Sequence, residues 1–246
     1  MTDYRIYRLS FSEWILYGGF GVMCAAAASY VFYRSFAVFL VFAPVGALYP
    51  LLKRKELINR RKARLLSEFR EGISALSSAL SAGFSLENSM KESEAEMWMI
   101  YGSGSLIAAE FAYINHRVGM NIPVEQAWEE FAERSNEDDV RNFAGVVKVA
   151  KRSGGEIVSI IAHTADTIGD KIHIEDEIRT MTAAKRFEQK IMNAIPIGIV
   201  LYIEFTSPGF FDSMYASIGG RAIMTACMAV YIAAIYLSGK ILDIEI

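Results

Sequence analysis

The sequence feature that most constrains the fold is a junction near residue 190, where a charged helical stretch meets an apolar one. From Glu156 onward, apolar residues recur at the spacing of one helical face. This stripe comprises Ile157, Ile160, Ile161, Ala165, Ile168, Ile172, Ile178 and Met181. The pattern predicts one amphipathic helix that continues to about Gln189, directly before a nearly chargeless run that begins at Ile191. We therefore expect a helix that leaves a water-facing domain and enters a membrane span.

The charged residues are distributed unevenly along the chain. Overall 53% of the residues are hydrophobic and 22% are charged, and most of the charges lie between Lys53 and Lys190. This division predicts an integral membrane protein with a soluble part. The net charge is only −3 and the isoelectric point is about 5.7. These values, and the lack of an RNA-binding or zinc-finger pattern, argue against nucleic acid as a partner.

The apolar residues fall into four nearly chargeless runs, each of which is predicted to form a membrane span. The four runs are residues 14–33, 35–52, 191–205 and 222–239. Because a second run follows the first almost at once, and no cleavage site leads into a soluble domain, the first run is interpreted as a span rather than a signal peptide. The short connections within each pair predict two helical hairpins.

Seven cations lie between Lys53 and Arg64, directly after the second run. By the positive-inside rule this end of the span is cytoplasmic, and the same cations would attract anionic lipid. A dedicated docking patch for a protein or for nucleic acid is the alternative reading. The predicted organisation is a cytoplasmic N-terminus 1–13, a transmembrane hairpin 14–52, a cytoplasmic domain 53–190, a transmembrane hairpin 191–239 and a cytoplasmic tail 240–246.

The central domain shows helical periodicity and no strand-like alternation, so the predicted fold class is all-α. Gly83 is placed to end the first helix of this domain and Ser85 to cap the next one. Gly119 should end a helix that begins near Leu106, and Pro123 fits the first turn of the next. The residues from Ser135 to Asp138 match a capping pattern for another helix. With the helix from Glu156, these signals predict a compact bundle of about six helices.

The pair Gly154–Gly155 has two readings. It either breaks the helix, or it allows another backbone to approach closely, and the two readings are compatible.

The sequence offers no catalytic, cofactor-binding or metal-binding pattern. It contains no phosphate-binding G-x-x-x-x-G-K-[ST] motif, so we expect no nucleotide site, no cofactor and no enzymatic activity. The histidines are too scattered for a zinc pair; they are His116, His163 and His173. Glu204 is a carboxylate near the far end of the third apolar run, which makes it a candidate for an intramembrane function or for an ordinary interfacial role.

Several of these signals occur together in an order that resembles the type II secretion F domain family, and within it the Tad (Flp) pilus assembly proteins TadB and TadC. They include Gly83 with Ser85, Gly119 with Pro123, the turn Ser153–Gly154–Gly155, and the early proline Pro196 in a span that follows a long helix. The resemblance covers roughly Leu65 to Gly220 together with the N-terminal hairpin, hence most of the chain.

The resemblance implies a non-enzymatic platform protein in a bacterial or archaeal cytoplasmic membrane, at the base of a type IV pilus or secretion machine. Its partners would be a hexameric secretion ATPase, pilin subunits and the lipid bilayer. Family members commonly carry two copies of the domain, whereas this chain carries one, so pairing with itself or with a sister protein is expected. The alternative hypothesis is a small transporter or channel subunit with a cytoplasmic regulatory domain, for which Glu204 would be the central polar residue.

Overall fold

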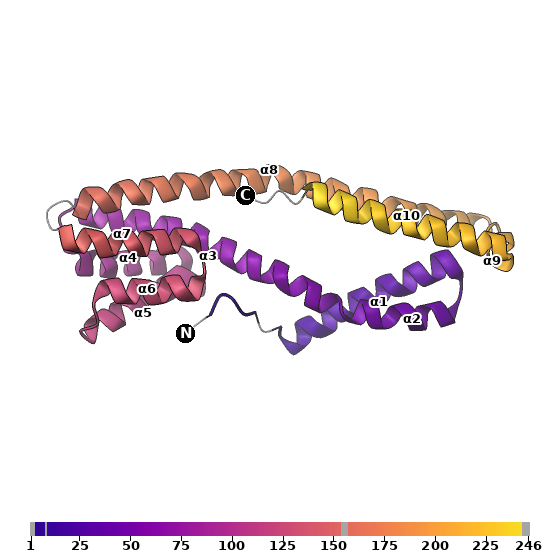
Figure 1. Ribbon diagram of the computed structural model, residues 1–246, viewed down its shortest axis with the longest axis horizontal. Helices are drawn as coiled ribbons and strands as arrows, with labels where there is room; N and C mark the ends of the chain where they lie inside the picture. The colour runs from indigo at the N-terminus through magenta and orange to yellow at the C-terminus, as the bar shows by residue number, and fades with distance from the viewer. Residues whose placement is uncertain (1–2, 8, 154–156, 243–246) are drawn as a thin grey trace. The chain divides into compact units, whose positions relative to one another are not determined.

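The computed structural model describes residues 3–7, 9–153 and 157–242, and every regular element in these ranges is a helix (Figure 1). The all-α prediction is therefore confirmed. The elements are α1 (Phe11–Tyr33), α2 (Phe36–Ala47), α3 (Tyr49–Ser81), α4 (Leu86–Tyr101), the 3₁₀ turn η1 (Gly102–Gly104), α5 (Leu106–Gly119), α6 (Val124–Ser135), α7 (Asp138–Ser153), α8 (Ile157–Thr206), α9 (Asp212–Ala216) and α10 (Ile218–Leu242).

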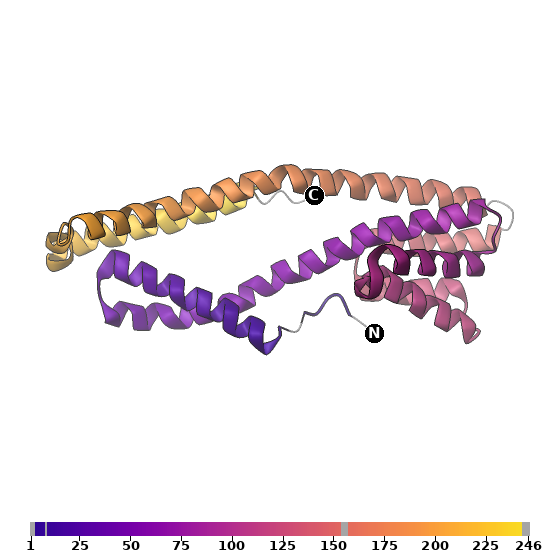
Figure 2. The ribbon, with the colours of Figure 1, turned by 180° about the vertical axis from the view of Figure 1, so that it is seen from behind.

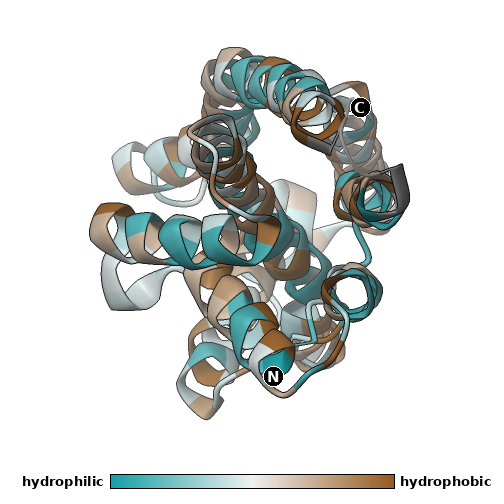
Figure 3. Cartoon of the chain, turned by 90° about the vertical axis from the view of Figure 1, so that its left-hand side faces the viewer, coloured by the Kyte–Doolittle hydropathy of each residue, from teal (hydrophilic) through white to brown (hydrophobic). Residues whose placement is uncertain are grey.

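The chain forms two compact units. Unit 1 consists of residues 1–8 and 55–177, and unit 2 consists of residues 9–54 and 178–246. Unit 1 therefore contains α4 to α7 with most of α3 and the first part of α8, and unit 2 contains α1, α2, α9 and α10 with the remaining parts of α3 and α8. Figure 3 shows hydrophilic and hydrophobic segments alternating along the helices of unit 1, as expected for helices with one buried face.

The core of unit 1 is a cluster of aromatic side chains. The ring centroid of Phe69 lies 6.3 Å from Trp128, 6.3 Å from Phe131 and 5.8 Å from Phe143. All four side chains are completely buried. They come from α3, α6 and α7, so the cluster joins helices that are far apart in the sequence.

The apolar stripe of α8 is buried only along its first part. Ile161, Ala165, Ile168 and Ile172 are buried among the core residues of unit 1, whereas Met181 is 67% exposed. The prediction of one uninterrupted helix is confirmed from Ile157 onward, because α8 runs for 50 residues. Residues of α8 from 178 onward belong to unit 2.

The helix ends near Gly83 and Ser85 follow the sequence prediction. Gly83 has a φ of +92°, which L side chains rarely adopt. Its amide donates a hydrogen bond to the carbonyl of Leu80 over 3.0 Å. The Ser85 hydroxyl then accepts a hydrogen bond from the amide of Asn88, which caps α4.

Gly119 is the last residue of α5, as predicted, and the left-handed conformation that follows is adopted by Asn121, whose side chain tolerates it. Two other signals act differently from their predictions. Pro123 is the residue before α6 and not a member of its first turn. Ser135 belongs to the end of α6 and donates its hydroxyl to the carbonyl of Ala132, so it does not cap α7.

Unit 2 begins with the hairpin of α1 and α2. Arg34 ends α1 in a left-handed conformation with a φ of +46°, which allows the chain to reverse within two residues. Gly21 of α1 faces Gly46 of α2, and a Cβ atom added to Gly46 would lie only 2.5 Å from the carbonyl oxygen of Gly21. Glycine at both positions lets the two backbones cross at contact distance.

The second apolar run, residues 35–52, does not form a single helix. α2 ends at Ala47 and α3 begins at Tyr49, with Leu48 between them. Pro50 has no amide hydrogen to donate to the carbonyl of Gly46, which accounts for the interruption.

The end of α8 and α10 lie side by side in both views of the ribbon (Figures 1 and 2). The Tyr231 hydroxyl of α10 donates a hydrogen bond to the carbonyl of Asn193 in α8. Within the part of the chain that is described, two helices are long and apolar enough to cross a membrane, α1 and Ile218–Ile241 of α10. Their positions match the first and fourth predicted runs.

Candidate functional site

Glu204 lies in a cluster of polar side chains at the end of α8. Its carboxylate forms an ion pair with the guanidinium of Arg34, at the turn between α1 and α2. The same guanidinium donates a hydrogen bond over 2.6 Å to Asp212, the first residue of α9. The Glu204 side chain is only 14% exposed, so the ion pair supplies the opposite charge that a shielded carboxylate requires.

Tyrosines complete this cluster. The Tyr215 hydroxyl donates a hydrogen bond over 2.6 Å to the carbonyl of Val31 in α1. The Tyr33 hydroxyl donates to the Oγ1 atom of Thr225 in α10 over 3.0 Å. The guanidinium carbon of Arg34 lies 5.9 Å from the ring centre of Tyr215, within the range of a cation–π interaction. The cluster therefore connects α1, α8, α9 and α10 within unit 2.

The arrangement of charges limits what the cluster can do chemically. One guanidinium faces two carboxylates, so Glu204 is held as the partner of a permanent cation. A carboxylate in this position is suited to fixing helix ends. A carboxylate that binds and releases protons during transport would instead need a path to water or to a second titratable group.

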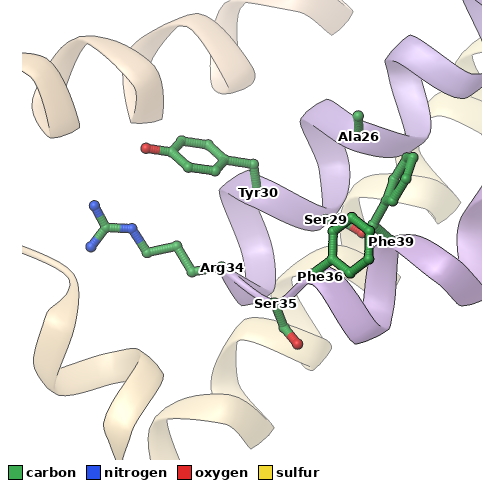
Figure 4. A pocket seen from close by; sticks show the side chains of 7 residues that line it. All are labelled: Ala26, Ser29, Tyr30, Arg34, Ser35, Phe36 and Phe39. Atoms are coloured by element: carbon green, nitrogen blue, oxygen red, sulfur yellow. The ribbon is translucent and has the colours of Figure 1, made fainter.

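A groove opens beside the cluster (Figure 4). Its volume is about 430 Å³, and its lining is mostly apolar. Tyr30 and Arg34 extend in the same direction from the end of α1, while Phe36 and Phe39 lie on the α2 side with ring centres 5.7 Å apart. Arg34 is thus directed toward its acidic partners, and the aromatic rings line the rest of the groove.

A second groove lies between α8 and α10, near Pro196. Its volume is about 390 Å³, and Gln189, Asn193 and Tyr231 are among the residues that line it. Pro196 lies inside α8 and cannot donate the usual backbone hydrogen bond to Met192. The Tyr231 hydroxyl bonds to the neighbouring carbonyl of Asn193, so α10 contacts α8 at the turn that the proline weakens.

The residues singled out by the family resemblance are divided between the two units. Pro196 shares unit 2 with Glu204, whereas Gly83, Gly119 and Pro123 belong to unit 1. Ser153 is the last residue of α7, also in unit 1. Gly154 and Gly155 lie outside the described residues, so their two readings both stay predictions.

Two charged residues of the cluster, Arg34 and Asp212, were not recognised from the sequence as partners of Glu204. Arg34 is the only charged residue in the turn between the first two apolar runs. A single cation between two apolar runs, together with a carboxylate at the outer end of a third, is a signal that could have suggested the pair.

The described part of the chain holds no group of three His, Cys, Asp or Glu side chains placed to bind a metal ion. In comparisons with known proteins, no family model, no curated protein and no solved structure matches the chain.

Proposed function

We propose that the chain is a non-enzymatic platform protein of a pilus or type II-like secretion machine in a cytoplasmic membrane. In this proposal unit 1 is a cytoplasmic domain that binds a secretion ATPase, and unit 2 lies in the bilayer, where it guides pilin subunits. The ordered sequence motifs and the all-helical fold support the proposal. The order of these motifs resembles that of the Tad type of platform protein.

The observation that carries the proposal is the continuity of two helices. α3 and α8 each contribute residues to both units, with the boundaries at residues 54/55 and 177/178. α8 has a buried stripe in unit 1 and exposed apolar side chains in unit 2, such as Phe187, which is 66% exposed. A motor that moves unit 1 would therefore act on unit 2 through unbroken helix backbone.

In this proposal unit 2 crosses the membrane four times. α1 and α10 supply two spans, and the end of α8 from Ile191 to Phe205 supplies a third. The remaining span is the broken segment of α2 and the first turn of α3. A break at membrane depth is tolerated where the freed backbone groups are buried in protein, as beside the Gly21–Gly46 crossing.

The ion pair of Arg34 and Glu204 would then lie at the outer ends of the spans. The turn with Arg34 and the connection with Asp212 both leave the apolar helices on the same side as Glu204. A charge pair at the membrane surface costs little because water and headgroups reach it. Its function in the proposal is to keep the two hairpins together while unit 1 is displaced.

The experiment that tests the proposal is photocrosslinking in living cells, followed by mass spectrometry of the captured proteins. Photoreactive residues are placed at exposed positions of unit 1, including Glu96, Met99 and Val149, and at Phe210 in unit 2 as a control. The proposal predicts capture of a hexameric ATPase by a group of neighbouring unit 1 probes and by none at Phe210.

Capture of lipids or of soluble regulators alone would contradict the platform function. So would normal surface filaments and normal secretion in cells that lack the protein. Substrate-dependent flux in liposomes that is abolished by Glu204→Ala would favour a transporter instead.

A further inference from the structure

The N-terminal segment of residues 3–7 packs on the helices of unit 1 before the chain enters α1. Tyr4 is the centre of this contact, because it is only 2% exposed. Its amide donates a hydrogen bond over 3.1 Å to the carbonyl of Arg134 at the end of α6. Its hydroxyl donates a hydrogen bond over 3.0 Å to the Oε1 atom of Glu110 in α5. The segment is thus attached through both backbone and side chain.

The site that receives Tyr4 is formed by three helices, and we name it the Tyr4 slot. Its residues are Arg61 of α3, Glu110 and Tyr113 of α5, and Arg134 of α6. The guanidinium carbon of Arg61 lies 5.1 Å from the centre of the Tyr4 ring, and that of Arg134 lies 5.0 Å from the centre of the Tyr113 ring. Outside the slot, the Arg5 side chain donates a hydrogen bond to the carbonyl of Glu133.

The slot does not need the tyrosine for its own charge balance. Glu110 is 1% exposed, and Arg134 donates to its two carboxylate oxygens over 3.0 and 2.7 Å. A buried carboxylate with a bidentate guanidinium partner is satisfied without further donors. Release of Tyr4 therefore leaves a paired slot behind, so the segment can leave without exposing an uncompensated charge to the core.

The electrostatics of the slot favour the neutral tyrosine. Burial, and next the negative charge of Glu110, raise the pKa of Tyr4 above its ordinary value of 10.0, while Arg61 and Arg134 act in the opposite direction. Below pH 10.0 the tyrosine is neutral whether it is bound or released, so binding is fully favourable there. At more alkaline pH the released form ionises more readily than the bound form, and binding weakens.

We propose that residues 3–7 act as a releasable strap that is bound in the Tyr4 slot of unit 1. The slot residues lie on helices, which are held by backbone hydrogen bonds, whereas residues 3–7 form no helix. A segment outside regular secondary structure opens at a lower cost than a helix does.

Release would change what unit 1 can do. An extended chain spans at most about 3.5 Å per residue, so the freed residues 3–9 could reach roughly 25 Å from Ser10. The bound strap covers the surface around Glu110 in α5 and Arg134 at the end of α6, and its release would open that surface to solvent. Bound and released straps thus define two states of the full-length protein.

Hydrogen exchange at the Tyr4 amide, measured by mass spectrometry with residue-resolving fragmentation on the full-length protein in lipid nanodiscs, tests the strap. Tyr4→Phe keeps the ring and removes one hydrogen bond to a charged group, so protection should fall roughly tenfold. Tyr4→Ala should bring exchange to the rate of an unstructured peptide. Tyr236→Phe in α10 removes an exposed hydroxyl of unit 2 and should change nothing.

Exchange at the unstructured rate in the unaltered protein would overturn the proposal, and so would protection that survives Tyr4→Ala.

A second measurement identifies the slot that the strap occupies. A photoreactive residue at Ile6, which is half exposed, should produce crosslinks within one chain. Crosslinked dimers in place of these would show that the strap binds a second copy, which contradicts a strap that is bound in the slot of its own chain.

Discussion

Units 1 and 2 are both built from helices but hold together in different ways. Unit 1 encloses large aromatic side chains and holds buried carboxylates such as Glu68 in hydrogen bonds. Unit 2 leaves large apolar side chains such as Phe187 exposed along its helices. Its internal contacts include a glycine crossing between α1 and α2 and a polar cluster around Arg34.

The difference shows which solvent each unit suits. Unit 1 gains its stability from burying apolar surface, which is the main driving force in water. Unit 2 buries little of its apolar surface, and a bilayer would cover what remains exposed, as the proposed function requires. Between helices in lipid, close backbone approach and polar contacts replace the hydrophobic effect as sources of stability.

The largest effect is expected from truncating an aromatic side chain in each unit. Phe69→Ala removes a ring that contacts three other aromatic rings in unit 1, and it should lower the free energy of unfolding by roughly 3–5 kcal/mol. Phe187→Ala removes an exposed ring of unit 2 and should change that free energy by less than about 0.5 kcal/mol. Chemical denaturation in detergent, followed by circular dichroism, measures both. Equal losses would remove the distinction between the units.

A carboxylate in each unit gives the second comparison. Glu68 accepts hydrogen bonds from the Ser105 hydroxyl over 3.0 Å and from the amides of Leu106 and Ile107 over 2.6 and 3.1 Å, at the start of α5. Glu68→Ala leaves these donors unpaired and should lower the free energy of unfolding by roughly 2–4 kcal/mol.

The matched variant Glu204→Ala removes one carboxylate from the cluster in unit 2, but Arg34 still has Asp212 as a partner. The free energy of unfolding should therefore fall by about 1 kcal/mol or less. Glu96→Ala, at an exposed position of α4, is the control and should be neutral. Denaturation curves recorded under the same conditions give the three values. A loss for Glu204→Ala as large as that for Glu68→Ala would mean that the polar cluster dominates the stability of unit 2.

The glycine crossing tests the packing of unit 2 directly. Gly46→Ala places a methyl group 2.5 Å from the carbonyl oxygen of Gly21, so the hairpin must open, at a cost of roughly 1–3 kcal/mol. Gly19→Ala meets no atom within 4 Å and should be neutral or slightly stabilising. Thermal unfolding of both variants in detergent provides the measurement. Equal melting temperatures would show that the crossing does not hold α1 to α2.

The smallest effect is the pH dependence of an ion pair at the surface of unit 1. The pair is formed by Lys171 and Asp139. The hydrogen bond that Lys171 donates to Asp139 raises the pKa of Lys171 above its ordinary value of 10.5. The contribution to stability is therefore complete below pH 10.5 and is lost as the pH rises through the higher pKa of the folded state. Because Lys171 is largely exposed, the change should be under about 1 kcal/mol. Denaturation at a series of alkaline pH values should show this loss, and Asp139→Asn should abolish it.

The sequence predicted those features of the fold that depend on neighbouring residues. The ends of α3 and α4 follow from Gly83 and Ser85, and the buried face of α8 follows from apolar spacing up to Ile172. Beyond that point the same spacing continues to Met181, but the helix has left unit 1 and the face is exposed. Periodicity reports which residues share a face, and only the tertiary fold determines what covers that face.

The features that the sequence did not predict depend on residues far apart in the chain. Arg34 and Glu204 are separated by 170 positions, and Tyr4 and Glu110 by 106. Glu68 resembles any carboxylate on a charged helix until the start of α5 is seen to lie against it. Local patterns carry no information on such pairs, because the contact exists only after the helices have packed.

The most direct test of the central claim, that unit 2 lies in a bilayer and unit 1 in water, uses the two cysteines of the chain. Cys24 of α1 and Cys227 of α10 are both exposed in the protein without lipid, and both belong to unit 2. Membrane vesicles are treated with a water-soluble maleimide before and after solubilisation in a denaturing detergent, with Ser103→Cys at the exposed η1 turn as the control. The account predicts that, in vesicles with the cytoplasmic face outward, the thiol introduced at the η1 turn reacts at once, while Cys24 and Cys227 react only after solubilisation. Rapid labelling of Cys24 and Cys227 in intact vesicles would contradict it.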